Sequence, residues 1–369
     1  MDLSYQMPTQ VIFGKGCVEK HGDIFGHHGK KALIVTGKTS ARISGALKDV
    51  CAALSNVSVS WSIYDGILPN PSIENVRNAA EKARSEKVDF IIGIGGGSPM
   101  DAAKAVAVLA VNDLDDNTLF SGPYEIMPLP VIAVPTTAGT GSEVTPYSIL
   151  TDMNNKTKKN LSHVFLFPKA AFLDATYTEK LPYDVTVNTA IDAFSHSVES
   201  ILSRKSNAMS AMIALESLRM LAPGLGLLED TRKIDFETRE KLLLGSMLAG
   251  MAIAQTGTTV VHAMGYSLTF FNNIDHGKAN GLLLCEYLNY VHTHNLKKMA
   301  GILEAMRMKS LEELQSLIKK QMKPSMTLTD EEISLYTEKA LMAKSVENTV
   351  PKPTAADIRT LYRKSLGKL

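Results

Sequence analysis

The first half of the chain repeats one pattern of hydrophobic and polar positions. A short apolar run, often β-branched, is followed by a turn rich in Gly, Pro or Ser and then by a stretch with helical spacing. These runs predict strands over residues 31–36, 57–64, 90–94 and 131–134. The helical stretches predict helices over residues 40–54 and 73–85 and from Pro99 onward. Such alternation is typical of parallel βαβ units with helices on both faces of one sheet.

The pattern changes after Leu181-Pro182. Almost no β-branched run remains in the second half, where apolar residues recur with helical periodicity. The clearest helical stretches cover residues 187–203, 208–221, 237–255 and 330–344. We therefore predict an α/β plus all-α fold, with a Rossmann-like parallel-sheet domain over residues 1–184 and an all-helical domain over residues 185–369.

Composition and charge exclude several classes of protein. Hydrophobic residues make up 45% and charged residues 21% of the 369, which is typical of a globular chain. The 39 Lys and Arg residues nearly balance the 38 Asp and Glu residues and form no long basic block, so we expect no nucleic-acid partner. Apolar runs are too short to cross a bilayer, so we expect no membrane association. The composition predicts a protein that acts on a small molecule.

The cysteine pattern indicates a reducing environment. Cys17, Cys51 and Cys285 are far apart and odd in number, and the sequence contains no CxxC pair. Neither a disulfide framework nor a thiolate zinc site is expected. The first residues alternate polar and apolar, unlike a signal peptide. We therefore expect a cytoplasmic location.

A glycine-rich turn follows the third predicted strand. Gly95-Gly96-Gly97 lets the backbone approach a ligand closely. Ser98 is predicted as the N-cap of the next helix, with Pro99 at its first position and Asp101 completing a capping box. The free N–H groups of this helix start favour a phosphate at the carboxyl edge of the sheet. The turn lacks the last glycine of GxGxxG, so an ordinary tight strand-to-helix turn stays an alternative.

Four residues of the second half form a candidate metal site. Asp192 and His196 are four apart and share one face of a predicted helix, while His262 and His276 follow in later helical segments. Three imidazoles and a carboxylate suit Fe(II), Zn(II) or Mn(II). Spacing alone leaves other interpretations open: a surface pair for Asp192 and His196, a core position for His262 and a turn position for His276.

Four segments together resemble one known family. They are GGGSPMDAAKA (95–105), PTTAGTGSEVTPYSILTD (135–152), DAFSHSVES (192–200) and HAMGYSL with DHGKANG (262–280). Their order and spacing are similar to those of the iron-dependent, or group III, alcohol dehydrogenases. The resemblance implies a nucleotide-binding α/β domain, a helical domain and an active site in the cleft between them. Dehydroquinate synthase shares this architecture.

The resemblance also implies site residues. The metal ligands fall on Asp192, His196, His262 and His276, and the expected cation is Fe²⁺, with Zn²⁺ or Mn²⁺ as alternatives. The pyrophosphate loop falls on Gly96, Gly97, Ser98 and Asp101. Further cofactor contacts fall on Asn70, Thr136, Thr137, Thr140, Ile149, Lys158 and Leu173.

Two positions depart from the common family pattern. Many NAD-preferring members carry an acidic residue after the first strand, where this chain has Gly37, followed by Lys38, Thr39 and Ser40. Nothing there repels a 2′-phosphate, so NADP is expected over NAD, unless Gly37 only serves the turn. A second histidine that often follows the third ligand is replaced by Tyr266, which we expect either in a proton relay or as a wall of the pocket.

The implied function is reversible hydride transfer between a small primary alcohol or diol and NADP, with the cation polarising the substrate oxygen. A glycerol dehydrogenase is an alternative, although those enzymes usually carry a lysine where this chain has Ser98-Pro99. A dehydroquinate synthase-like lyase and a nucleotide-binding protein without catalysis are further alternatives. The sequence fixes neither the substrate nor the metal. Residues 3–13 are a candidate edge strand for pairing with a partner, and a homodimer or higher homo-oligomer is expected.

Overall fold

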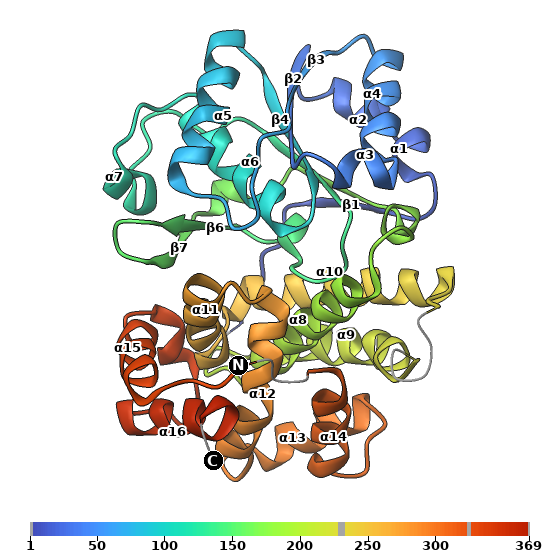
Figure 1. Ribbon diagram of the computed structural model, residues 1–369. Coiled ribbons are helices and arrows are strands. Elements are labelled where there is room, and N and C mark those ends of the chain that lie inside the picture. Colours follow the sequence, from blue (N-terminus) through green and yellow to red (C-terminus); the bar gives the residue numbers. More distant parts are fainter. Residues whose placement is uncertain (1–2, 228–232, 323–325, 368–369) are drawn as a thin grey trace. The chain divides into compact units, whose positions relative to one another are not determined.

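The computed structural model describes residues 3–227, 233–322 and 326–367, which divide into two compact units (Figure 1). Met7–Leu181 form an α/β unit, and Pro182–Leu369 form a helical unit. The segment Met1–Gln6 groups with the helical unit, although the sequence places it in the first domain. Gln6 shows why, because its backbone N–H donates to Gln255 Oε1 at 3.1 Å and its carbonyl accepts from Gln255 Nε2 at 2.8 Å.

The α/β unit is built on a six-stranded parallel sheet with the strand order β1-β8-β5-β4-β2-β3. A separate antiparallel hairpin is formed by β6 and β7. The strands are β1 (Gln10–Phe13), β2 (Lys31–Thr36), β3 (Ser60–Tyr64), β4 (Phe90–Gly95), β5 (Val131–Pro135), β6 (Tyr147–Asp152), β7 (Thr157–Ser162) and β8 (Ala170–Leu173). Because the six strands are parallel, their carboxyl ends share one edge, where ligands of such sheets bind.

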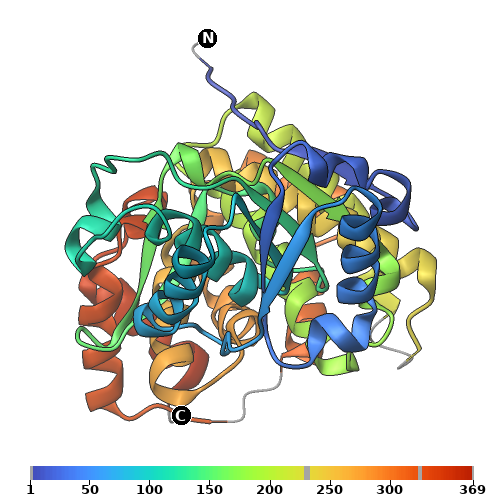
Figure 2. The ribbon, with the colours of Figure 1, turned by 90° about the horizontal axis from the view of Figure 1, so that it is seen from above.

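Helices cover both faces of the sheet (Figure 2). One apolar core packs α5 and α6 against the sheet, and the other core packs α1, α2, α3 and α4 against it. The helices of this unit are α1 (Cys17–Lys20), α2 (Asp23–Gly26), α3 (Ser40–Ser44), α4 (Ala46–Asn56), α5 (Ile73–Glu86), α6 (Gly97–Leu109) and α7 (Asp116–Ser121), with short 3-10 turns η1 (Ser142–Val144), η2 (Val164–Leu166) and η3 (Ala175–Thr178). Strand residues buried on both faces explain the continuous apolar runs of the sequence.

The structure corrects several local predictions. The helix expected over residues 40–54 is broken at Gly45, whose φ is 92°. The predicted capping by Ser98 and Asp101 is wrong, because α6 begins at Gly97 with Gly96 as its N-cap and no side-chain cap. Strand β3 starts at Ser60 rather than residue 57. Strand β8 and the β6–β7 hairpin were not predicted. The candidate edge strand over residues 3–13 is present only as β1, which pairs with β8 of the same chain.

The helical unit contains α8 (Tyr183–Leu202), α9 (Ala208–Leu227), α10 (Phe236–Thr256), α11 (Val260–Asn272), α12 (His276–His292), α13 (Leu296–Ala305), α14 (Leu311–Gln321), α15 (Asp330–Leu341), η4 (Lys344–Asn348) and α16 (Ala355–Leu366). Helix α8 is central, since it packs against α9, α10 and α12. Helix α11 packs against α12 and α15. The predicted order, a parallel-sheet unit followed by helices, is confirmed.

Among the described residues, none of the single helices has the length and hydropathy needed to span a membrane. One pair, α10 and α11, passes that test only when the two helices are taken together, and the chain bends by 111° between them.

Candidate active site

The four residues predicted as metal ligands converge inside the helical unit. Asp192 and His196 lie one turn apart on α8, His262 lies in the first turn of α11, and His276 is the first residue of α12. Their side chains meet because α12 packs against both α8 and α11. The start of α12 is held to α8 by Asn188, whose Nδ2 donates to the Asp275 carboxylate at 2.9 Å.

The distances between ligand atoms fit a single divalent cation. Asp192 Oδ1 lies 3.6 Å from His262 Nε2 and 3.9 Å from both His196 Nε2 and His276 Nε2. Atoms that each bind one cation at about 2.1 Å lie roughly 3.4 Å apart in a tetrahedron and about 4.2 Å apart when opposite. Asp192, His196 and His262 each offer an atom within 4.8 Å of the others. His276 Nε2 is within 3.9 Å of Asp192 Oδ1 but is not part of that group of three. Imidazoles and a carboxylate are donors that suit Fe(II), Zn(II) or Mn(II).

Burial makes this group electrostatically unusual. The side chains of Asp192, His196 and His262 are at most 6% exposed, whereas His276 is 26% exposed. Burial alone would raise the pKa of Asp192, but His196, His276 and His262 hold it well below its usual value. The carboxylate is therefore ionised and ready to bind a cation. The partial exposure of His276 marks the accessible side of the group.

Glu199 supports His262 from the side opposite the other ligands. Its Oε1 accepts a short hydrogen bond from His262 Nδ1 and one from Ser195 Oγ at 2.9 Å. Its Oε2 accepts from the backbone N–H and the hydroxyl of Thr259, both at 2.6 Å. Thr259 precedes α11, so one carboxylate both caps this helix and fixes the imidazole that the helix carries. A proton kept on Nδ1 leaves Nε2 as the atom that faces Asp192.

The same pair shifts two pKa values. Burial would raise the pKa of Glu199, but His262 and Thr259 hold it below its usual value. Burial would lower the pKa of His262, but Glu199 and Asp192 raise it to about 9. Because an imidazole binds a metal only through a free lone pair, cation and proton compete for His262.

Tyr266 lies beside His276, the partly exposed member of the predicted ligands. Its ring is stacked on that of His276, with centroids 5.7 Å apart and an interplanar angle of 18°. The residue is on α11, one turn after His262, as the sequence spacing predicts. This position suits either a wall of a substrate pocket or a step of a proton relay.

The predicted cofactor residues gather at the carboxyl edge of the sheet. Gly37, Lys38 and Ser40 follow β2, the strand next to β4, and Lys38 is exposed. The pyrophosphate loop, Gly96 to Ser98, follows β4. Thr136, Thr137 and Thr140 follow β5, and Leu173 is the last residue of β8.

Contacts join the loop that follows β4 to its neighbours. The backbone N–H of Asn70 donates to Ser98 Oγ at 3.1 Å, and Lys158 Nζ donates to Asn70 Oδ1 at 2.7 Å. A Cβ at Gly97 would lie only 2.7 Å from Thr140 Cγ2, so a larger residue would push the two loops apart. Asn70, Ser98, Lys158 and Thr140 thus form one group around the start of α6.

Asp101 and Lys104 on α6 bind the segments that follow β5. Its two oxygens accept from Ser142 Oγ at 2.5 Å and from the backbone N–H of Ile149 at 2.9 Å. The fully buried Lys104 donates to Ser142 Oγ at 2.8 Å and to the Tyr147 carbonyl at 2.7 Å. Burial lowers the pKa of Lys104 to about 8. Asp101 therefore holds Ser142, which follows β5, and Ile149 on β6 in place, and its predicted contact with the cofactor stays a prediction.

Sequence reasoning missed three supporting residues. Glu199 lies seven residues after Asp192 on the same helix face, so its spacing was visible but its partner on α11 was not. Lys104 stands in the apolar part of α6, three residues after Asp101. Asn280 lies four residues after His276, and its Nδ2 donates to Asp192 Oδ1 at 3.0 Å.

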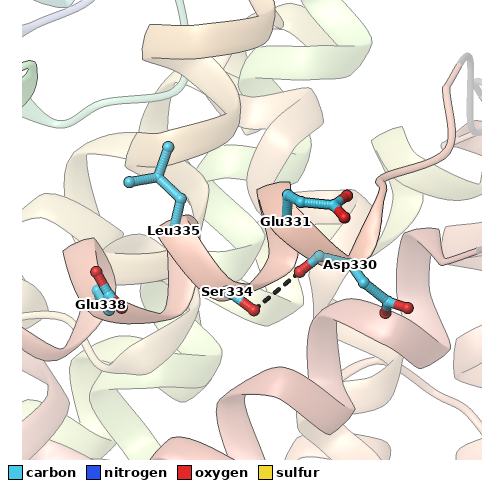
Figure 3. Close-up of a pocket in the computed structure, with 5 residues that line it drawn as sticks. All are labelled: Asp330, Glu331, Ser334, Leu335 and Glu338. Atoms are coloured by element: carbon cyan, nitrogen blue, oxygen red, sulfur yellow. Dashed lines mark hydrogen bonds between the residues drawn. The ribbon is translucent and has the colours of Figure 1, made fainter.

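A surface depression on α15 lies outside this group (Figure 3). It is lined by Asp330, Glu331, Ser334, Leu335 and Glu338, and it contains none of the predicted ligands. Ser334 Oγ donates to the Asp330 carbonyl at 2.9 Å within the helix. These side chains all come from one helix, so the depression is a feature of its outer surface.

Comparison with known proteins agrees with the geometry. Residues 8–175 match the family described as "Iron-containing alcohol dehydrogenase", and residues 186–366 match "Fe-containing alcohol dehydrogenase family, C-terminal". Lactaldehyde reductase of Escherichia coli (strain K12) is 32% identical over 309 residues, which are 82% of this chain and 80% of that protein. The NADPH-dependent butanol dehydrogenase of Clostridium saccharobutylicum is 29% identical over 80% of this chain and 74% of that protein.

A solved structure extends the likeness to the whole fold. The iron-containing alcohol dehydrogenase of Thermotoga maritima is 41% identical and superposes with a TM-score of 0.92, with 99% of each chain covered. The family matches span both units, and the predicted resemblance and the predicted class of enzyme, an oxidoreductase, are confirmed. The chain therefore belongs to the iron-containing alcohol dehydrogenase family.

Proposed function

We propose that the protein oxidises a small primary alcohol or diol with NADP⁺ and runs the reverse reduction of the aldehyde. A hydride passes from the carbinol carbon to C4 of the nicotinamide, the hydroxyl proton is released, and the products are the aldehyde, NADPH and H⁺. The observation that carries this proposal is the convergence of Asp192, His196, His262 and His276 in a chain of this family. The relatives, which include a lactaldehyde reductase and a butanol dehydrogenase, support a small substrate.

The residues divide the work between them. Asp192 and the three histidines would hold a divalent cation, which supplies Lewis acidity toward a substrate oxygen. The start of α6, with Gly97 and Ser98, would bind the pyrophosphate through its free N–H groups. Tyr266, stacked on the partly exposed His276, would pass the released proton toward solvent.

The expected preference for NADP rests on the residues after β2. Gly37 offers no carboxylate to bind ribose hydroxyls or to repel a 2′-phosphate, and Lys38 next to it is exposed. Arg42 on α3 faces Asp65 across 3.3 Å, and both side chains are more than half exposed. Such an exposed ion pair is weak, so Arg42 is available to a phosphate as well.

Two variants of Gly37 test this preference. A Cβ at this position would meet only the Ile67 carbonyl oxygen, at 3.4 Å, so a side chain fits. Gly37→Asp should weaken NADPH binding by roughly tenfold or more through like-charge repulsion and leave NADH binding unchanged or improved. Gly37→Ala is the matched control and should change neither. Equal loss of both nucleotides in Gly37→Asp would contradict the assignment.

The reaction itself is tested by anaerobic reduction of butanal. Protein stripped with a chelator is reloaded with Fe(II) or Zn(II) and assayed with NADPH and with NADH in separate reactions. We expect turnover only after metal is restored, with NADPH preferred. No turnover with any combination of metal and nucleotide would refute the proposed reaction.

Two further properties belong to this proposal. We infer a homodimer or higher homo-oligomer, since β1 lies at the edge of the six-stranded sheet that the described residues form, and sedimentation would measure the state. The cytoplasmic location expected from the cysteine pattern stays a prediction.

A further inference from the structure

Asn280 lies where the three ligand-bearing helices meet. It is on α12, one turn after His276, and it is fully buried. Its Nδ2 lies 3.0 Å from Asp192 Oδ1 on α8, 3.0 Å from His262 Nε2 on α11 and 3.4 Å from His276 Nε2. One amide group thus touches three of the four predicted ligands.

The orientation of this amide follows from the atoms around it. A carboxylate oxygen accepts hydrogen bonds and an amide nitrogen donates them, so the nitrogen of Asn280 faces Asp192 Oδ1, at 3.0 Å. Asn280 Oδ1 then points away from the ligands, and it is buried with no hydrogen-bond partner among the described residues. An unsatisfied buried oxygen is costly, so its presence requires a compensating role for the nitrogen.

Gly265 on α11 makes room for that oxygen. A Cβ at this position would overlap Asn280 Oδ1, so any larger residue would push the amide out of its place. The glycine lies in the interior of a helix, where alanine would normally be preferred. The helix therefore gives up intrinsic stability at the point where it meets the amide.

We propose that Asn280 is a positioning residue of the metal centre, which acts through Asp192, and that Gly265 is the residue that admits it. The Asn280 amide donates to the same carboxylate oxygen that faces the three histidines and fixes its rotation toward them. This inference rests on the proposed metal site but adds residues that are not ligands.

Binding of Co(II) tests the inference without any assay of turnover. Its affinity is measured by competition with a chelator, and its visible absorption reports the geometry of the ligands. Asn280→Ala should weaken Co(II) binding by about 10–100-fold and change the spectrum. Gly265→Ala, which leaves Asn280 intact, should produce the same defect. In the double variant the added methyl meets no amide oxygen, so the defect should be no larger than in Asn280→Ala alone.

Two matched controls separate positioning from packing. Asn295→Ala removes another buried amide of the helical unit, whose Nδ2 donates to the Val291 and Val350 carbonyls. Gly301→Ala adds a methyl in the interior of α13, with only an ordinary contact at 3.7 Å. Both should leave Co(II) affinity and spectrum unchanged, even if Asn295→Ala lowers the unfolding temperature.

The outcomes are distinct. An unchanged affinity and spectrum in Asn280→Ala would overturn the inference while leaving the metal centre standing. A native Co(II) site in Gly265→Ala would overturn the role of the glycine. A wild-type chain that takes up no Co(II) would overturn the proposed centre and this inference with it.

Discussion

Replacing Glu199 by glutamine should disable the proposed metal centre without removing a proposed ligand. The substitution keeps the shape of the side chain but leaves one acceptor oxygen where there were two. In the wild type, one oxygen serves His262 Nδ1 and Ser195, and the other serves the N–H and hydroxyl of Thr259. A glutamine can satisfy only one of these pairs.

Both orientations of the glutamine carry a cost. If its oxygen faces Thr259, its NH₂ faces His262 Nδ1 and favours the tautomer with the proton on Nε2, which cannot bind a cation. If its oxygen faces His262, two donors meet at Thr259 and a buried N–H at the start of α11 loses its acceptor. One unmade buried hydrogen bond costs about 1–3 kcal/mol. Since about 1.4 kcal/mol is tenfold in affinity, metal binding should weaken by roughly 10–100-fold.

The assay is chelator competition with Zn(II), with NADPH binding measured in the same samples. Nucleotide affinity should be unchanged, because the predicted cofactor residues lie in the α/β unit. Glu216→Gln is the matched control, since Glu216 is a helical glutamate of the same unit that is 45% exposed and pairs with Arg219. An E199Q protein that folds and binds zinc as tightly as the control would refute the reasoning.

Three other changes have defined outcomes. His276→Ala should abolish metal-dependent turnover and leave NADPH affinity nearly intact, and full activity would reject it as a ligand. Tyr266→Phe keeps the ring stacked on His276 and removes only the hydroxyl. A fall in kcat by about 10²-fold at unchanged KM would show that Tyr266 takes part in a proton relay, and an unchanged kcat would show that it only lines the pocket. Burial raises the pKa of Glu143 to about 7 from 4.5, so the folded state keeps its proton to higher pH than the unfolded state does. Wild-type stability should therefore fall by about 3 kcal/mol between pH ~4.5 and ~7. In urea unfolding at several pH values, Glu143→Gln should lose this slope, and an unaltered slope would place its origin elsewhere.

The fold was predictable where hydrophobic periodicity is strong. Residues 31–36 and 90–94 are continuous apolar runs, because both faces of their strands are buried, and the structure places β2 and β4 there. β1 and β8 have only four residues each and gave no comparable pattern. The hairpin β6–β7 was missed because β7 carries polar residues with a single buried leucine, Leu161.

The capping error has a different cause. Ser98 and Asp101 have the spacing of a capping box, but both side chains have partners elsewhere in the chain. Ser98 Oγ accepts from Asn70, and Asp101 accepts from Ser142 and Ile149, more than forty residues later. Tertiary contacts thus override a local pattern at the place where the nucleotide is expected. Local spacing cannot reveal them, because those partners are brought there by the sheet.

The candidate ligands were assigned through the family resemblance, since spacing alone left other interpretations open, whereas the residues that support them matched no pattern that the sequence analysis used. Helix α8 shows why support is needed: every residue from Ala190 to Leu202 is buried, so no amphipathic face sets its rotation. Polar contacts set it instead, since Ser197 pairs with Ser217 on α9 at 2.8 Å and Ser200 accepts from Thr256 on α10 at 3.1 Å. Because these contacts fix the rotation of α8 about its axis, Asp192 and His196 face α11 and α12. The polar residues on its other faces therefore help to position the proposed metal ligands, although none of them would touch the cation.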